Sequence, residues 1–365
     1  MERIPSASEI RSQLAGFAKP DTRKGAVLFL VDLFMYLGAI TAVLFAPWIL
    51  AKLAAGVVAG IKMGNLITLA HDAAHNSLTS SRKLNKLIAV VSFTPGLFNY
   101  RLWIYDHHNL HHQKTNEDHP DSYTPLSKNE FDALSYWGKI KQRFYRLPTL
   151  WVFGIYYIVE RWWQVKFIPR ARIPAEVRRE SWPHAIYLVG YLLIFLALLA
   201  YAPTYSDTPL LQAILFGFVV PFYVFQSLFA FTVYVQHTHP RVAWFKGRPD
   251  RNGDGRQDLI SVNLVFPKWY SYLTHYVYDH AAHHVNPAIP CYRLPEAQAK
   301  LNEMLGPLAV SEKFSFAWLR QAQRRCKLYD FEQHRWLDFE GRPTSRVTLS
   351  FEADLLRPVY AFRAV

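Results

Sequence analysis

The chain of 365 residues has only two cysteines, Cys291 and Cys326, and neither belongs to a CxxC pair. Two isolated thiols cannot build the framework of a small disulfide-stabilised secreted fold. We therefore expect both to be ordinary reduced thiols, and the stability of the fold has to come from another source.

Acidic residues are also scarce, with 28 Asp and Glu against 41 Lys and Arg, which gives a formal charge of +13. A surplus of this size suits either nucleic acid or the anionic face of a membrane. Long apolar runs decide between the two, because a nucleic-acid-binding domain has no use for them. We expect membrane lipid as a partner and no nucleic acid.

Four stretches of the chain are apolar enough to cross a bilayer, which takes roughly 20 residues each. They cover residues 26–48, 49–70, 184–202 and 210–235. The short connections "APWILAK" and "APTYSDTP" predict two antiparallel hairpins. The expected fold class is an all-α integral membrane protein of four transmembrane helices. It forms a single domain over residues 1–365, with a helical cap from 71–183 and 236–365.

The basic residues predict the orientation of this multi-pass protein. Five of them precede the first span, and "RARIPAEVRR" precedes the third, whereas the loop "APTYSDTP" has none. We therefore expect the cap to lie in the cytosol, beneath a bacterial inner membrane. Residues 84–98 and 156–169 are too short or too polar to span, and we expect them to form interfacial helices.

The histidines of this sequence are concentrated in four short groups. The groups read "HDAAH" (71–75), "HHNLHH" (107–112), "YVQHTHP" (234–240) and "HAAHH" (280–284). The first and third begin where a span ends, and the others lie in segments assigned to the cytosol. All four can therefore meet in one plane just below the membrane.

Their spacing fits metal ligands, because helix residues three or four apart share a face. Neutral imidazole binds iron, copper and zinc well, whereas clustered imidazolium groups would repel one another. Nine ligands are available if one of His107 and His108 is counted with the following residues: His71, His75, His111, His112, His237, His280, His283 and His284. A zinc site takes four, so nine ligands suit two ions. Iron is the natural choice if dioxygen is activated.

These residues resemble the membrane fatty acid desaturases and their hydroxylase relatives, whose histidine boxes read HxxxH, HxxHH or HxxxHH, and HxxHH. The flanks "WIYDHHNLHHQKTN", "FTVYVQH" and "HHVNPAIPCYRLPEA" are similar to the family as well, over roughly Gly64 to Leu301. The resemblance implies a histidine-rich cytosolic cap that holds two non-haem irons beside a tunnel for an acyl chain.

The resemblance further implies O₂-dependent desaturation of a fatty acyl chain, carried as a free acid, a thioester or a lipid, with O₂ as cosubstrate. The chain lacks the HPGG haem motif of a fused cytochrome b5. Electrons must then come from a separate carrier, such as ferredoxin, rubredoxin or cytochrome b5 with its reductase.

Several residue assignments stay open at this point. Counting four residues on from Trp103, as the family does, selects His107, whereas α-helical geometry favours His108, and we prefer His107. His237 is either a further ligand or a histidine that caps a helix end. Asp72 either orients a ligand imidazole or is an acid at a helix start.

The same metal site could serve other reactions. It could hydroxylate the chain, or decarboxylate a free fatty acid to a terminal alkene. A membrane zinc hydrolase would need HExxH, but Asp-Ala-Ala stands between His71 and His75. A metal transporter is disfavoured because none of the grouped histidines lies in the middle of a span.

The remaining histidines and one acidic motif are expected to be structural. His119 and His239 precede prolines and read as loop residues, and His184, His275 and His334 have no partner pattern. The motif "DRNGDGRQD" (250–258) imitates a calcium loop. An EF-hand needs Glu at the twelfth position, where this chain has Ser, so we expect a polar turn.

Overall fold

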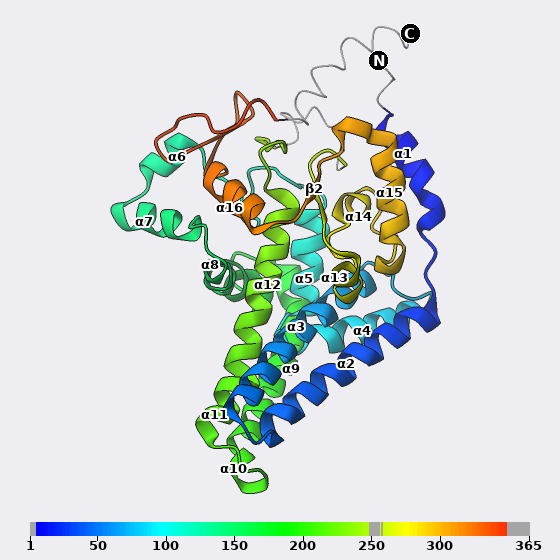
Figure 1. The fold of residues 1–365 in the computed structure, drawn as a ribbon, viewed down its shortest axis with the longest axis vertical. Coiled ribbons are helices and arrows are strands. Elements are labelled where there is room, and N and C mark those ends of the chain that lie inside the picture. The colour runs from blue at the N-terminus through cyan, green and yellow to red at the C-terminus, as the bar shows by residue number, and fades with distance from the viewer. Residues whose placement is uncertain (1–4, 248–255, 257, 349–365) are drawn as a thin grey trace.

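Helices dominate the computed structural model, which describes residues 5–247, 256 and 258–348 (Figure 1). Within these residues, four helical runs are long and apolar enough to cross a membrane. They are α2 (Thr22–Phe45), α3 (Ile49–Ala74), α9 (Ala175–Ala200) and the continuous run Leu210–His237. The last run consists of α11 (Leu210–Ile214), η4 (Leu215–Val219) and α12 (Val220–His237).

The helix ends differ from the limits expected from apolarity alone. The third helix begins at Ala175 rather than near His184 and carries Pro183 inside it. The second continues past Ala70 to Ala74, so that the first histidine pair lies in its last turn. Helix ends follow backbone hydrogen bonding and capping, whereas apolarity reports only the stretch suited to lipid.

Close packing of α3 against the fourth long helix depends on Gly56 and Gly60. A Cβ atom at Gly56 would lie 2.5 Å from the carbonyl oxygen of Phe216, and one at Gly60 would lie 2.7 Å from that of Pro221. Small residues four apart allow two helix backbones to approach closely. This contact fixes the helix of the first histidine pair against the helix that ends at His237.

In the part of the chain that the structure describes, three helical segments have π-type hydrogen bonding, in which residues five apart share a face. They are η2 (Tyr105–His111), η3 (Tyr157–Lys166) and η4. The first contains most of "HHNLHH", and the second lies in the segment expected to be interfacial. Sequence patterns that assume α-helical spacing are out of register in these segments.

Most of the shorter elements surround the histidine-bearing segments in the upper half of Figure 1, whereas α10 lies at the bottom of the picture. The helices are α1 (Ala7–Leu14), η1 (Ala15–Phe17), α4 (Arg82–Phe93), α5 (Tyr100–Ile104), α6 (Lys128–Ala133), α7 (Tyr136–Tyr145), α8 (Trp151–Tyr156), α10 (Ala202–Tyr205), α13 (Lys268–Leu273), α14 (His280–Val285), η5 (Cys291–Arg293), α15 (Leu294–Leu305), η6 (Gly306–Leu308) and α16 (Phe316–Arg325).

The expectation of an all-α fold needs one correction, because the C-terminal third also contains strands. β1 (Asn263–Val265) pairs in parallel with β2 (Ser311–Lys313), and β3 (Leu328–Asp330) pairs antiparallel with β4 (Arg335–Leu337). These pairs satisfy backbone groups of short extended segments that no helix includes. Most of the motif at 250–258 lies outside the described residues, apart from a buried ion pair between Arg256 and Asp258 (2.9 Å).

Candidate metal centre

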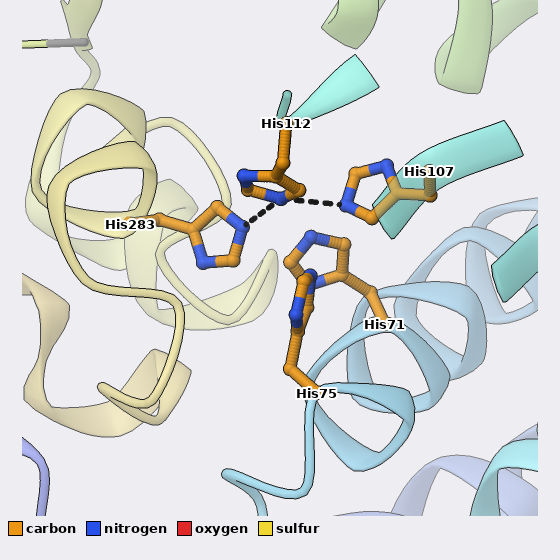
Figure 2. Close-up of side chains that lie close together, drawn as sticks. All are labelled: His71, His75, His107, His112 and His283. Atoms are coloured by element: carbon orange, nitrogen blue, oxygen red, sulfur yellow. Dashed lines mark hydrogen bonds between the residues drawn. The ribbon is translucent and has the colours of Figure 1, made fainter. Parts of the chain in front are cut away.

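Nine of the ten histidines expected at a metal site converge in two groups. The first group is His71, His75, His107, His112 and His283, and the second is His111, His237, His280 and His284. One nitrogen of each histidine lies within 4.8 Å of those of the other members of its group. Figure 2 shows the rings of the first group facing one another from three separate segments. His108 belongs to neither group.

Four elements position these side chains. The C-terminal end of α3 supplies His71 and His75, and η2 with the residue that follows it supplies the middle box. His237 is the last residue of α12. The short helix α14 supplies the third box, in which His280 and His284 share one face because they are four residues apart.

The π-helix explains why His107, and not His108, joins the first group. The backbone N–H of His112 donates to the carbonyl oxygen of His107 (3.0 Å), and the Nε2 atoms of these two rings lie 3.1 Å apart. The ring of His108 stacks instead on His75, with centroids 4.1 Å apart. Its Nε2 atom has no hydrogen-bond partner among the described residues. An α-helix would bring His108 near His112 instead, but this segment is a π-helix.

The distances between ring nitrogens fit the ligand sets of metal ions. The Nε2 atom of His112 lies 3.1 Å from that of His107 and 3.2 Å from that of His283. In the second group the shortest distances are 3.2 Å for His111 with His284 and 2.9 Å for His237 with His280. Two nitrogens that bind one ion at ~2.1 Å and at a right angle lie about 3.0 Å apart.

The rings are also in the charge state that a metal needs. Burial, together with the neighbouring imidazoles, lowers the pKa of His283 and of His284 well below the ordinary value. Burial and the same kind of neighbours lower the pKa of His107 and His112. These histidines are therefore neutral at pH 7, and each offers a lone pair to a cation.

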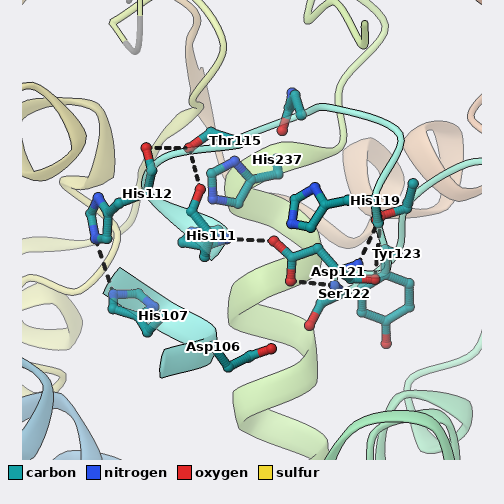
Figure 3. Close-up of polar contacts among 12 residues, drawn as sticks. Asp106, His107, His111, His112, Thr115, His119, Asp121, Ser122, Tyr123 and His237 are labelled. Atoms are coloured by element: carbon teal, nitrogen blue, oxygen red, sulfur yellow. Dashed lines mark hydrogen bonds and ion pairs between the residues drawn. The ribbon is translucent and has the colours of Figure 1, made fainter. Parts of the chain in front are cut away.

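Two carboxylates fix the orientation of one ring in each histidine group. Oδ1 of Asp72 lies 3.0 Å from Nδ1 of His71, and Oδ2 of Asp121 lies 2.7 Å from Nδ1 of His111 (Figure 3). A carboxylate that accepts the Nδ1 proton leaves the Nε2 lone pair pointing into the group. Asp72 lies in the last turn of α3, so it is not an acid at a helix start.

A cavity of about 500 Å³ adjoins the two groups. It extends from the histidines along α3, α12 and α13, and most of its lining is apolar, including Ile67, Leu228 and Phe229. Its size lies within the ~300–1,000 Å³ range of small-molecule sites. An elongated apolar molecule in this cavity would lie directly beside the imidazoles.

The comparison with known families supports the same interpretation. Residues 25–315 match the family model described as fatty acid desaturase. The chain belongs to this family. The resemblance seen in the histidine boxes is thus confirmed. As a desaturase the protein is an oxidoreductase that uses O₂ to desaturate a fatty acyl chain, and the family implies iron.

Curated proteins similar to this desaturase carry desaturase names. The sn-1 oleoyl-lipid 12-desaturase of Synechocystis sp. is 24% identical over 299 residues, which cover 81% of this chain and 80% of the relative. The chloroplastic omega-6 fatty acid desaturase of Spinacia oleracea is 25% identical over an alignment that covers 85% of this chain and 66% of the relative. An sn-1 acyl-lipid omega-3 desaturase (ferredoxin) of Synechocystis sp. is 24% identical over an alignment that covers 68% of this chain and 67% of the relative.

The desaturase contains a buried charge network that sequence reasoning missed. Arg161 donates to Asp106 (2.9 Å) and to Asp121 (3.3 Å), and Lys166 donates to Asp106 (2.5 Å). Although burial opposes it, the charges of Arg161 and Lys166 hold the pKa of Asp106 below its usual value. Arg161 and Lys166 are five residues apart on η3, so π-helical spacing brings both to one carboxylate.

The histidines expected to be structural lie outside both groups. The ring of His239 lies 3.6 Å from Glu312, and Nδ1 of His334 lies 3.1 Å from the carbonyl oxygen of Trp244. His184 lies against the ring of Tyr100. His275 lines the cavity and contacts Asp32, a residue of α2. His119 is enclosed near Asp121, whose charge raises its pKa while the larger effect of burial lowers it.

Replacement of Asp121 by Asn tests the network. The neutral amide of the D121N side chain would lack the charge that holds His111 and Arg161, so we expect a ten- to hundredfold loss of iron affinity or turnover. Iron per chain and the rate of product formation measure this. The exposed Asp118 in the same segment is the matched control, and D118N should behave as wild type. Unchanged iron and turnover in D121N would contradict the role.

Proposed function

We propose that this protein introduces a double bond into the acyl chain of a membrane lipid, with two iron ions held by the nine converging histidines. The observation that carries the proposal is the convergence of the histidines in two separate groups beside one apolar cavity. The names of the relatives, which include acyl-lipid desaturases, favour a lipid as the carrier of the chain.

One ion would be bound by the first histidine group and the other by the second. Bound iron would supply the activation of dioxygen that attack on an inert C–H bond needs, because no side chain alone can attack such a bond. Burial lowers the pKa of His107, His112, His283 and His284 and so keeps these rings neutral. Asp72 and Asp121 orient the rings of His71 and His111. The apolar lining keeps bulk water away from the site and holds the acyl chain against it.

The proposed setting is a bilayer crossed by the four long helical runs as two hairpins. The first two runs pack along each other, and the third contacts the start of the fourth. Both α2 and α9 expose large apolar side chains, such as Phe34 (67%) and Ile194 (65%), as lipid-facing helices do. The basic N-terminal flank favours the histidines on the cytosolic side of a bacterial inner membrane.

Product analysis tests the proposal. Membranes containing the protein, supplied with O₂, a reduced carrier and lipids with saturated or monounsaturated chains, should yield chains with one more double bond. Gas chromatography with mass spectrometry of the acyl chains measures this. Hydroxylated chains would instead support a hydroxylase, and terminal alkenes one carbon shorter would support a decarboxylase. Either product in place of the alkenoyl chain contradicts desaturation.

The electron donor is proposed to be a small acidic protein of the ferredoxin type, as the printed name of one relative indicates for that relative. Exposed arginines on α16, including Arg320 and Arg324, belong to the surplus of basic residues in this chain. Attraction between oppositely charged surfaces raises the association rate and is screened by salt.

We therefore expect turnover at limiting donor to fall at least about tenfold between low and high ionic strength. Steady-state rates in a salt series measure this. Rates with a small chemical reductant in the same salt series serve as the control and should change little. Donor-driven turnover that is independent of salt would exclude electrostatic docking.

A further inference from the structure

A cluster of buried polar side chains lies at the end of the cavity that is remote from the histidine groups. It consists of Asp32 on α2, Lys62 and Asn65 on α3, and His275 just after α13. Nζ of Lys62 donates to Oδ1 of Asp32 (2.8 Å), and Nε2 of His275 contacts Oδ2 of the same carboxylate. Asn65 donates to the carbonyl oxygen of Leu273 (2.8 Å). None of the four is more than 8% exposed.

A structural role alone does not explain this cluster. Asp32 and Lys62 lie inside helices that are apolar enough to span a membrane, where ionisable residues are costly. An ion pair in such a place often stabilises a fold no better than apolar side chains of similar volume. The helices α2 and α3 already pack along each other. Lys62, Asn65 and His275 moreover all line the cavity.

The cavity reaches the outer surface of the molecule beside this cluster. Four lining residues at this end are largely exposed, namely Met35 (47%), Ile61 (40%), Trp269 (66%) and Leu273 (50%). The opening is therefore framed by α2, α3 and α13. Its rim is apolar and carries an exposed Trp, the kind of side chain that is enriched at membrane interfaces. Such a rim suits an opening toward lipid rather than water.

The chemistry of the cluster suits a neutral hydrogen-bond acceptor. The ammonium group of Lys62 has three N–H donors. Among the described residues, Asp32 is the one that accepts a hydrogen bond from it. Because the carboxylate balances the charge of the ammonium group, the pair offers donors without a net positive charge. An ester carbonyl can accept such a hydrogen bond, whereas a second carboxylate would crowd Asp32 with like charge.

The distance along α3 sets a length for the bound chain. Lys62 and His71 are nine residues apart in the sequence of one helix, which corresponds to about 13–14 Å at ~1.5 Å per residue. An extended chain of single bonds advances ~1.2 Å per bond, because three backbone bonds span at most 3.3–3.6 Å. A carbonyl at Lys62 would therefore place a carbon about eleven bonds away beside the first histidine group.

We propose that Lys62, held by Asp32 and assisted by Asn65 and His275, binds the ester carbonyl of a bilayer lipid. The acyl chain then lies in the cavity, and the carbon that is desaturated is counted from the carboxyl end. This inference rests on the proposed function and assigns these residues a positioning role. It also identifies the substrate as an ester that enters laterally from the membrane.

The test uses the full-length protein in membranes with lipids whose acyl chains differ in length by two carbons. Wild type should place the new double bond at a constant distance from the carboxyl end. The variant K62M should raise KM about tenfold or more, since a hydrogen bond to a charged group is lost, and should give products at several adjacent positions. The variant K62R should restore a single position. Iron per chain should be unchanged in both.

The matched control is Lys52→Met, which removes another buried lysine from the same helix. Lys52 contacts Thr208 and the carbonyl oxygen of Val43 and does not line this cavity, so K52M should keep the wild-type position. A constant distance from the methyl end, or unchanged KM and position in K62M, would overturn the positioning role while desaturation stands. Wild type that forms no new double bond would instead overturn the proposed function itself.

Discussion

Simultaneous replacement of His283 and His284 by Ala is expected to abolish iron binding and turnover. The two residues are adjacent on α14, yet the structure places His283 in the first histidine group and His284 in the second. The double variant therefore removes one ligand from each proposed ion. Because the metal carries the chemistry, we expect turnover to fall at least about a thousandfold. Iron analysis of the purified protein and product formation measure this.

The control for this experiment is a histidine outside both groups. His184 lies on α9 against Tyr100, and H184A should keep its iron and most of its activity. An iron content and a turnover in H283A/H284A that match those of H184A would refute the whole account of the site. The single variants add detail, since each should impair mainly the ion of its own group.

The geometry of α14 explains how one short helix contributes rings to both histidine groups. His280 and His284 are four residues apart and share a face, whereas His283 is rotated by about 100° from His284. The helix thus projects two rings into one group and one ring into the other. A shift of α14 would move rings of both groups together.

Features that leave a local pattern were predictable from the sequence. Four helical runs able to span a membrane follow from continuous apolarity, which the bilayer thickness demands. The convergence of His71, His237 and His280 follows from their positions at the ends of spans or in the segments between them. The histidine boxes carry the family resemblance, because metal ligands require fixed residue types at fixed spacing.

Contacts between distant segments were not predictable in this way. Asp121 follows His111 by ten residues in a loop, and Arg161 comes from another segment, so no periodicity links them. Asp32 and His275 are 243 positions apart in the sequence. The sequence shows Asp32 only as a charge inside an apolar run. Its contacts with the cavity-lining Lys62 and His275 depend on the three-dimensional packing of α2, α3 and α13.

In the middle histidine box the sequence shows the spacing of the histidines but not the type of helix that carries them. In an α-helix the ring of residue i+4 lies over that of residue i, which pairs His108 with His112. In η2 the backbone bonds join residues five apart, which pairs His107 with His112. Trp103, stacked on His107 with ring centroids 4.3 Å apart, holds this ring in place.

Separate replacement of His107 and of His108 by Ala tests this pairing with two neighbouring residues as each other's control. We expect H107A to lose at least about a hundredfold in turnover together with iron, because a ligand is removed. H108A removes only a ring that stacks on His75, so turnover should stay within about threefold. Turnover and iron per chain measure both effects. Equal losses would mean that the two rings share the role, and the reverse order would mean that the segment is α-helical when iron is bound.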